Sequence, residues 1–100
     1  MEKKTPHCRL SLIRTLVQEG RVRATASALR GAVEVGIPDL SGICAIVLAL
    51  TSLNFYKSMT TQADHRIWQD VYHATTAQGV AVYLKLTVIE DLLIVSFKEL

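Results

Sequence analysis

The sequence is poor in the residues that build disulfide frameworks, zinc sites and phosphate-binding loops. Its two cysteines, Cys8 and Cys44, form no CxxC pair, and its five glycines form no glycine-rich loop. No set of cysteine and histidine residues has the spacing of a zinc site, and paired carboxylates are scarce. We therefore expect two reduced thiols in a cytosolic protein that carries no metal and no cofactor.

Long apolar runs are also missing from the chain. The longest wholly apolar run is Ile43–Leu50, far shorter than the ~20 residues that a helix needs to cross a bilayer. The charged segment Met1–Lys4 is followed by no apolar stretch of the kind found in a signal peptide. These absences predict a cytoplasmic protein that has no contact with a membrane.

The chain has little net charge, +2 at neutral pH, but the charge is unevenly distributed. Residues 1–30 contain seven basic and two acidic residues, a net of +5, whereas residues 31–100 contain four basic and seven acidic residues, a net of −3. This asymmetry favours a polyanion as a partner. A solvated helical face would give the same pattern, so charge alone does not decide between the two.

Length and composition predict a single domain over residues 1–100, because half of the residues are hydrophobic. Apolar residues at helical spacing predict helices over about residues 6–18, 26–35 and 42–50. Thr5, Thr25 and Ser41 are the expected N-caps, with Pro6 in the first turn of the first helix. The third helix is apolar on nearly every side, which predicts that it is buried.

After Leu50 the apolar pattern changes from helical spacing to alternation. It predicts strands over residues 55–60, 67–72, 80–89 and 92–98, with a turn at Glu90-Asp91. The third strand is the clearest, because Val82, Leu84 and Leu86 share one face. The fold class is therefore α+β, with N-terminal helices packed on a C-terminal antiparallel sheet.

Hairpin geometry predicts which polar side chains meet on this sheet. A two-residue loop at Glu90-Asp91 pairs Ile89 with Leu92, and therefore places Tyr83 opposite Lys98 on the same face. A loop over residues 61–65 would place Lys57 opposite Gln69, and a loop over residues 73–79 would place Gln69 opposite Tyr83. With these two loop lengths, which are assumptions, the four side chains form one row across four strands.

Two lysines, a tyrosine and a glutamine on one face suit phosphate chemistry without a metal ion. RNA supplies its own nucleophile, the 2′-hydroxyl, so a protein needs to align it, remove its proton and stabilise the charge on phosphorus. Each of these side chains taken alone is more simply interpreted as solvated, and His65 as a loop histidine without a role. Trp68 and Tyr72 are interpreted as packing residues rather than as a platform for bases.

Several motifs together resemble the MqsR toxin family along nearly the whole chain. The motifs are Phe55–Thr61 (FYKSMTT), Asp64-His65, Ile67–Tyr72 (IWQDVY), Val82–Lys85 (VYLK) and Asp91–Lys98 (DLLIVSFK), with Met1–Lys3, Thr5–His7 and Arg9–Ser11 near the start. Their spacing is nearly that of the family. The loop over residues 73–78 is less basic than in the family, the stretch around residues 31–41 matches weakly, and Cys8 replaces a threonine.

The resemblance implies a RelE-like α+β fold and a metal-independent endoribonuclease that cleaves mRNA at GC-starting sites such as GCU. It implies an MqsA-like antitoxin, which binds zinc and DNA, so that operator DNA would be contacted only indirectly. The functional positions of the family fall on Lys57, Gln69, Tyr83 and Lys98. Lys57 and Lys98 are then expected to stabilise the phosphorane, Tyr83 to donate a proton or stack on a base, and Gln69 to position the RNA.

Two alternatives stay open from the sequence. A non-catalytic binding module could bind only the antitoxin and, with it, operator DNA. A ribosome-associated RNA-binding factor would share the same fold and charge pattern.

Overall fold

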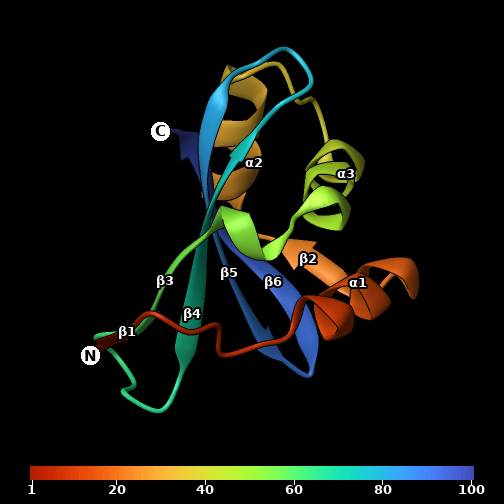
Figure 1. The fold of residues 1–100 in the computed structure, drawn as a ribbon. Helices are drawn as coiled ribbons and strands as arrows, with labels where there is room; N and C mark the ends of the chain where they lie inside the picture. Colours follow the sequence, from red (N-terminus) through yellow and green to blue (C-terminus); the bar gives the residue numbers. More distant parts are fainter.

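Three helices cover one face of a six-stranded β-sheet in the computed structural model, which describes residues 1–100 (Figure 1). The helices are α1 (Leu10–Gln18), α2 (Ala26–Glu34) and α3 (Leu40–Ala49), followed by the short 3-10 helix η1 (Ser52–Asn54). The strands are β1 (Glu2–Lys3), β2 (Val22–Ala24), β3 (Phe55–Thr60), β4 (Trp68–Thr75), β5 (Ala81–Ile89) and β6 (Asp91–Glu99). The predicted α+β class is confirmed.

The strand order is β1-β3-β4-β5-β6-β2. The four central strands form the predicted antiparallel meander, and β1 joins one edge by antiparallel pairing with β3. At the other edge β2 pairs with β6 in the parallel direction, so the sheet is mixed. Neither of these two edge strands, β1 and β2, was predicted as a strand.

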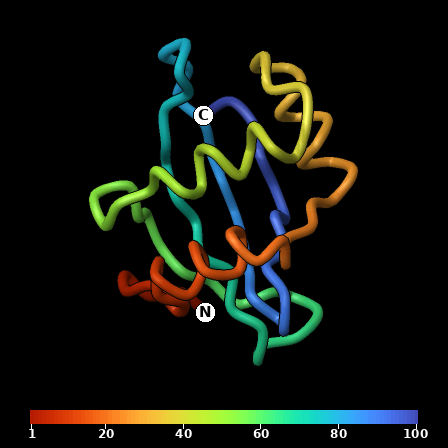
Figure 2. Tube along the Cα trace, turned by 90° about the vertical axis from the view of Figure 1, so that its right-hand side faces the viewer, coloured from red at the N-terminus to blue at the C-terminus, as the bar shows by residue number.

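The helices lie in front of the sheet in Figure 2, and the main hydrophobic core lies between these two layers. The alternating residues Val82, Leu84 and Leu86 of β5 are completely buried there, as the pattern predicted. Ile13 of α1 and Ile43 of α3 meet them from the helical layer. No helix of the structure is both long enough and apolar enough to cross a membrane.

Helix α1 begins at Leu10, so the expectation that Thr5 and Pro6 begin it was wrong. The preceding segment is held against the sheet instead, because the carboxylate of Asp70 accepts hydrogen bonds from the backbone N–H groups of His7 and Cys8, at 2.9–3.1 Å. Those two N–H groups point at the sheet and are committed before the helix begins. A cap residue is a local signal, and this contact to β4 overrides it.

Of the other two predicted helix starts, the cap of α2 is confirmed and the cap of α3 was wrong. Thr25 caps α2 as predicted, since its hydroxyl accepts a hydrogen bond from the backbone N–H of Ala28. The cap of α3 is Asp39 rather than Ser41, and its carboxylate accepts from the backbone N–H of Gly42. Helix α3 is also less buried than predicted, because only Ile43 and Val47 are buried within it.

The β5–β6 hairpin reaches its predicted register by an unexpected route. Glu90 alone, at φ 62°, turns the chain, and Ile89 pairs with Asp91 rather than with Leu92 as predicted. A register shift next to Lys85 then leaves Val95 unpaired, because Lys85 faces Ser96 while Leu86 faces Ile94. This bulge restores the residue that the shorter turn removed.

The two remaining loops differ in length from the assumed ones. The β3–β4 connection covers residues 61–67, and the β4–β5 connection covers residues 76–80. Within the longer loop the backbone N–H of Thr61 donates to the carbonyl oxygen of Ile67. The Thr61 hydroxyl donates to the carbonyl oxygen of Asp64 and accepts from its backbone N–H. In the shorter loop the backbone N–H of Thr76 donates to the carbonyl oxygen of Val80, and the backbone N–H of Val80 donates to the Thr76 hydroxyl. Gly79 supplies a left-handed residue at φ 84°. Strand β4 is therefore extended to Thr75, beyond its predicted end at Tyr72.

Candidate active site

The face of the sheet that no helix covers carries most of the candidate residues, and we refer to it as the open face (Figure 1). Alternation along the strands places these side chains opposite to the buried ones of the core. They are Tyr56, Lys57, Gln69, Val71, His73, Tyr83, Lys85, Ser96 and Lys98. All four residues predicted for the site therefore share one face.

The predicted pairing of Tyr83 with Lys98 is confirmed. The two residues are direct partners in the β5–β6 register. The Lys98 ammonium lies 5.0 Å from the centroid of the Tyr83 ring, within the range of a cation–π contact. A phosphate bound at Lys98 would therefore also lie close to the tyrosine ring.

The single row across four strands was wrong, because the two loops have other lengths. Lys57 faces Val71 rather than Gln69, Gln69 faces Met59, and Tyr83 faces His73. His73 follows Gln69 by four positions along β4, which is a distance of ~13 Å at the usual strand rise. Gln69 is thus on the open face but well away from the Tyr83–Lys98 pair.

The ammonium of Lys57 is paired with a carboxylate from β1. Glu2 accepts its hydrogen bond and forms an ion pair with it. This contact raises the pKa of Lys57 above its ordinary value and lowers the pKa of Glu2. Lys57 is therefore a fixed positive charge whose partner must be displaced or shared when an anion binds.

A third lysine, Lys85, lies between the two predicted ones and was missed by the sequence analysis. It faces Ser96 on β6 and Val71 on β4, and Val71 in turn faces Lys57 on β3. Burial, the charge of Lys98 and the charge of Lys57 lower the pKa of Lys85. Its position two residues after Tyr83 on the clearest strand was the signal that could have found it.

Aromatic rings lie beside the lysines. The rings of Tyr56 and His73 are stacked at 4.3 Å, and His73 lies 6.2 Å from the ring of Tyr83. The ammonium of Lys4 lies 5.1 Å from the centroid of the Tyr56 ring. Tyr56 and His73 were not predicted as site residues, because a bulge in β3 between Phe55 and Lys57 inserts Tyr56 next to His73.

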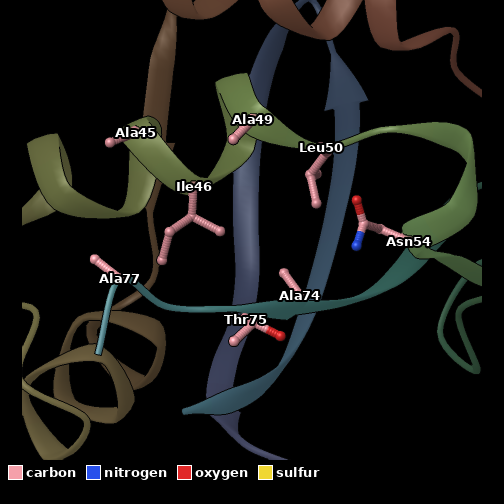
Figure 3. Close-up of a pocket in the computed structure, with 8 residues that line it drawn as sticks. All are labelled: Ala45, Ile46, Ala49, Leu50, Asn54, Ala74, Thr75 and Ala77. Carbon is pink, nitrogen blue, oxygen red and sulfur yellow. The ribbon is translucent and has the colours of Figure 1, made fainter. Parts of the chain in front are cut away.

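The opposite face offers a cavity with different chemistry. A cavity of about 380 Å³ lies between α3 and the end of β4 and is lined largely by small apolar side chains (Figure 3). Its lining residues are Ala45, Ile46, Ala49, Leu50, Asn54, Ala74, Thr75 and Ala77. None of them is charged, so this cavity offers no positive charge to a phosphate and no acidic or basic side chain for proton transfer.

Several charged residues of the first third make internal contacts. Arg14 donates a hydrogen bond to the carbonyl oxygen of Leu50, and Arg21 binds Asp91 and the carbonyl oxygen of Glu90.

His65 is exposed in the loop after β3. No three histidine, cysteine, aspartate or glutamate side chains are placed together to hold a metal ion, and Cys8 and Cys44 are free thiols.

Comparison with known proteins places this arrangement in a family. A sequence model of the family described as "Motility quorum-sensing regulator, toxin of MqsA" matches residues 5–99. The chain belongs to the MqsR toxin family. It is 57% identical over 99 residues to the mRNA interferase toxin MqsR of Escherichia coli (strain K12), and the match covers 99% of each chain. The resemblance inferred from the motifs is confirmed.

The relative from Escherichia coli is named for its action on mRNA, and the open face of this chain carries side chains of kinds that suit RNA. Lysines offer point charges to phosphate oxygens, and aromatic rings offer flat surfaces on which unpaired bases stack. Both kinds of side chain occur on this face of the structure.

Proposed function

We propose that the protein is an mRNA interferase toxin that cleaves RNA on the open face by attack of the 2′-hydroxyl, without a metal ion. The endoribonuclease class is that of its family and of its 57% identical relative. The observation that carries the mechanism is the cluster of Lys57, Lys85 and Lys98 beside Tyr83, on a face that no helix covers. Within this cluster Lys57 and Lys98 supply the positive charge for which other nucleases use a metal ion.

The proposed roles follow from the positions of the side chains. Lys98 and Lys57 stabilise the charge that develops on the phosphorane oxygens, since a lysine offers a point charge to phosphate oxygens. Tyr83, in contact with Lys98, donates a proton to the leaving 5′-oxygen or stacks on a base. Gln69 lies ~13 Å along β4 from His73, so it holds the RNA away from the cut rather than at it.

The finer features of the proposal come from the family. We place the cuts at GC-starting sites such as GCU. The partner is an MqsA-like antitoxin, because the family is described as the toxin of MqsA, and operator DNA is reached only through that antitoxin. The proposed place of action is the cytoplasm, where mRNA is found.

Cleavage of a defined RNA by the purified protein in the presence of EDTA tests the proposal. We expect cuts at GC-starting triplets with 5′-hydroxyl ends, and a loss of at least about 100-fold in rate for Lys98→Ala, the usual cost of one charge-stabilising donor. Circular dichroism and thermal unfolding show whether the variant keeps its fold.

Two other outcomes would replace the proposal. A folded protein that cleaves no RNA, with or without ribosomes, but binds its antitoxin would be a non-catalytic binding module. A protein that cleaves only when ribosomes are added would be a ribosome-associated factor. Full activity of Lys98→Ala would remove Lys98 from the site while leaving the activity in place.

A further inference from the structure

Lys85 occupies the centre of the cationic cluster. Lys98 follows Ser96, the direct partner of Lys85, by two residues, which makes it a diagonal neighbour on the adjacent strand at ~7–8 Å. Lys57 lies two strands away on the other side, with Val71 between them. A phosphate that reached both Lys57 and Lys98 would therefore lie over Lys85.

The surroundings of Lys85 contain no carboxylate that compensates its charge. Lys57 has Glu2, but Lys85 forms neither an ion pair nor a hydrogen bond. The side chain is half-buried, and Val71 beside it is completely buried although no helix covers this face, which indicates that neighbouring side chains close over it. A partly desolvated ammonium between two others is costly unless an anion binds or the amine loses its proton.

The charged and aromatic groups around Lys85 on the open face decide which lysine loses its proton most easily. They are Lys57 and Tyr56 on β3, His73 on β4, Tyr83 on β5, Lys98 on β6 and Glu2 on β1. Of the lysines, Lys57 has its pKa raised by Glu2, and Lys85 has its pKa lowered by burial and by its two cationic neighbours. Lys85 therefore loses its proton more easily than Lys57 does.

We propose that Lys85 is a further catalytic residue, whose amine contacts the scissile phosphate and takes the proton of the attacking 2′-hydroxyl; this rests on the proposed function. The bond from the 2′-oxygen to phosphorus forms while the bond to the 5′-oxygen breaks. The 2′-hydroxyl proton moves to Nζ of Lys85, and the 5′-oxygen takes a proton from Tyr83 or Lys98. The products are a 2′,3′-cyclic phosphate and a 5′-hydroxyl, and exchange with water restores both side chains.

Two variants separate a proton acceptor from a positive charge. Lys85→Arg keeps the charge but cannot lose its proton, and Lys85→Met keeps much of the stem that packs beside Val71. Arg30→Ala is the matched control, because it removes one exposed positive charge from α2, on the other side of the sheet. Single-turnover cleavage is measured from pH 6 to pH 10 (about the range where a lowered lysine pKa is visible), together with binding of an RNA that lacks the 2′-hydroxyl at the cut.

The expected result is a loss of about 100-fold or more in cleavage rate for both Lys85 variants, the usual contribution of a general base. Lys85→Arg still binds the uncleavable RNA as tightly as the unaltered protein does. The rise of the rate with pH, which follows the fraction of neutral Lys85, disappears in Lys85→Arg, and Arg30→Ala retains the full rate and its rise with pH.

Other results overturn the inference. If Lys85→Arg cleaves at the normal rate with the normal pH profile, Lys85 is at most a charge that binds RNA, whatever Lys85→Met does. Such a result leaves the proposed function intact, because the unaltered protein and Arg30→Ala still cleave. If the unaltered protein cleaves no RNA at all, the proposed function fails first, and the role of Lys85 fails with it.

Discussion

The two faces of the sheet use polar side chains in opposite ways. On the helix-covered face, the buried carboxylate of Asp70 accepts hydrogen bonds from the backbone of His7 and Cys8 and from the hydroxyl of Ser58, so its lone pairs are satisfied inside the protein. On the open face, Lys85 and Lys98 have no carboxylate partner. The hydrogen-bonded carboxylate of Asp70 holds the fold together, whereas the ammonium groups of Lys85 and Lys98 are available to a substrate.

The largest effect on the covered face is expected for Asp70→Ala. The substitution leaves two backbone N–H groups and the Ser58 hydroxyl without their acceptor, and should lower the free energy of unfolding by about 3 kcal/mol. Urea denaturation measures this loss. The cleavage rate per folded molecule should stay normal, and a stable but inactive Asp70→Ala would contradict the division between the two faces.

Two tyrosines on neighbouring strands provide a matched pair of intermediate effects. Tyr72 is completely buried on the covered face, its hydroxyl has no hydrogen-bond partner, and burial raises its pKa to about 12. Tyr72→Phe removes that unsatisfied hydroxyl, so the free energy of unfolding should stay unchanged or rise by up to ~1 kcal/mol. Cleavage should not change.

Tyr83→Phe should have the reverse outcome. Stability should change by less than about 0.5 kcal/mol, because the side chain is only half-buried on the open face. Cleavage should fall by about 100-fold if the hydroxyl donates the proton to the leaving oxygen. A rate near normal would assign Tyr83 to base stacking alone, and thermal unfolding of both variants serves as the common reference.

The smallest effect is expected for Glu2→Gln, which removes the partner of Lys57. The pKa of Glu2 is lowered by Lys57, so the pair is fully charged at neutral pH and is lost only as the pH falls through that lowered pKa. The variant should bind RNA more tightly, by less than about tenfold, and with a steeper dependence on salt. Weaker binding would instead show that Glu2 positions Lys57 for the substrate.

The clearest strands were predictable because their side-chain pattern records burial. Val82, Leu84 and Leu86 established β5, and Phe55–Thr60 was located without error. In β6 the buried residues are Leu92, Ile94 and Phe97, and the change from a spacing of two to three marks the bulge at Val95. The pairing of Tyr83 with Lys98 was predicted with the wrong turn, and it held only because the bulge compensates.

What could not be predicted depends on the geometry of two loops and on contacts between distant parts of the chain. The row containing Lys57, Gln69 and Tyr83 required loop lengths that hydrogen bonds within residues 61–67 and 76–80 determine. Lys85 was not predicted as a site residue, because its central position depends on the registers of three strand pairs. The start of α1 was mispredicted because Asp70, far along the chain, holds the backbone before it.

The topology also has a consequence for how the protein folds. Both edges of the sheet come from the first quarter of the chain, since Glu2 pairs with Met59 and Val22 pairs with Leu92. Contacts between residues so far apart in sequence make folding slow, and neither edge strand can form before the central meander exists. Until then β3 and β6 expose unpaired backbone, which is the state most prone to aggregate with other chains. A folding chain would therefore stay prone to aggregate until its own N-terminal strands pair with β3 and β6 and cover both edges of the sheet.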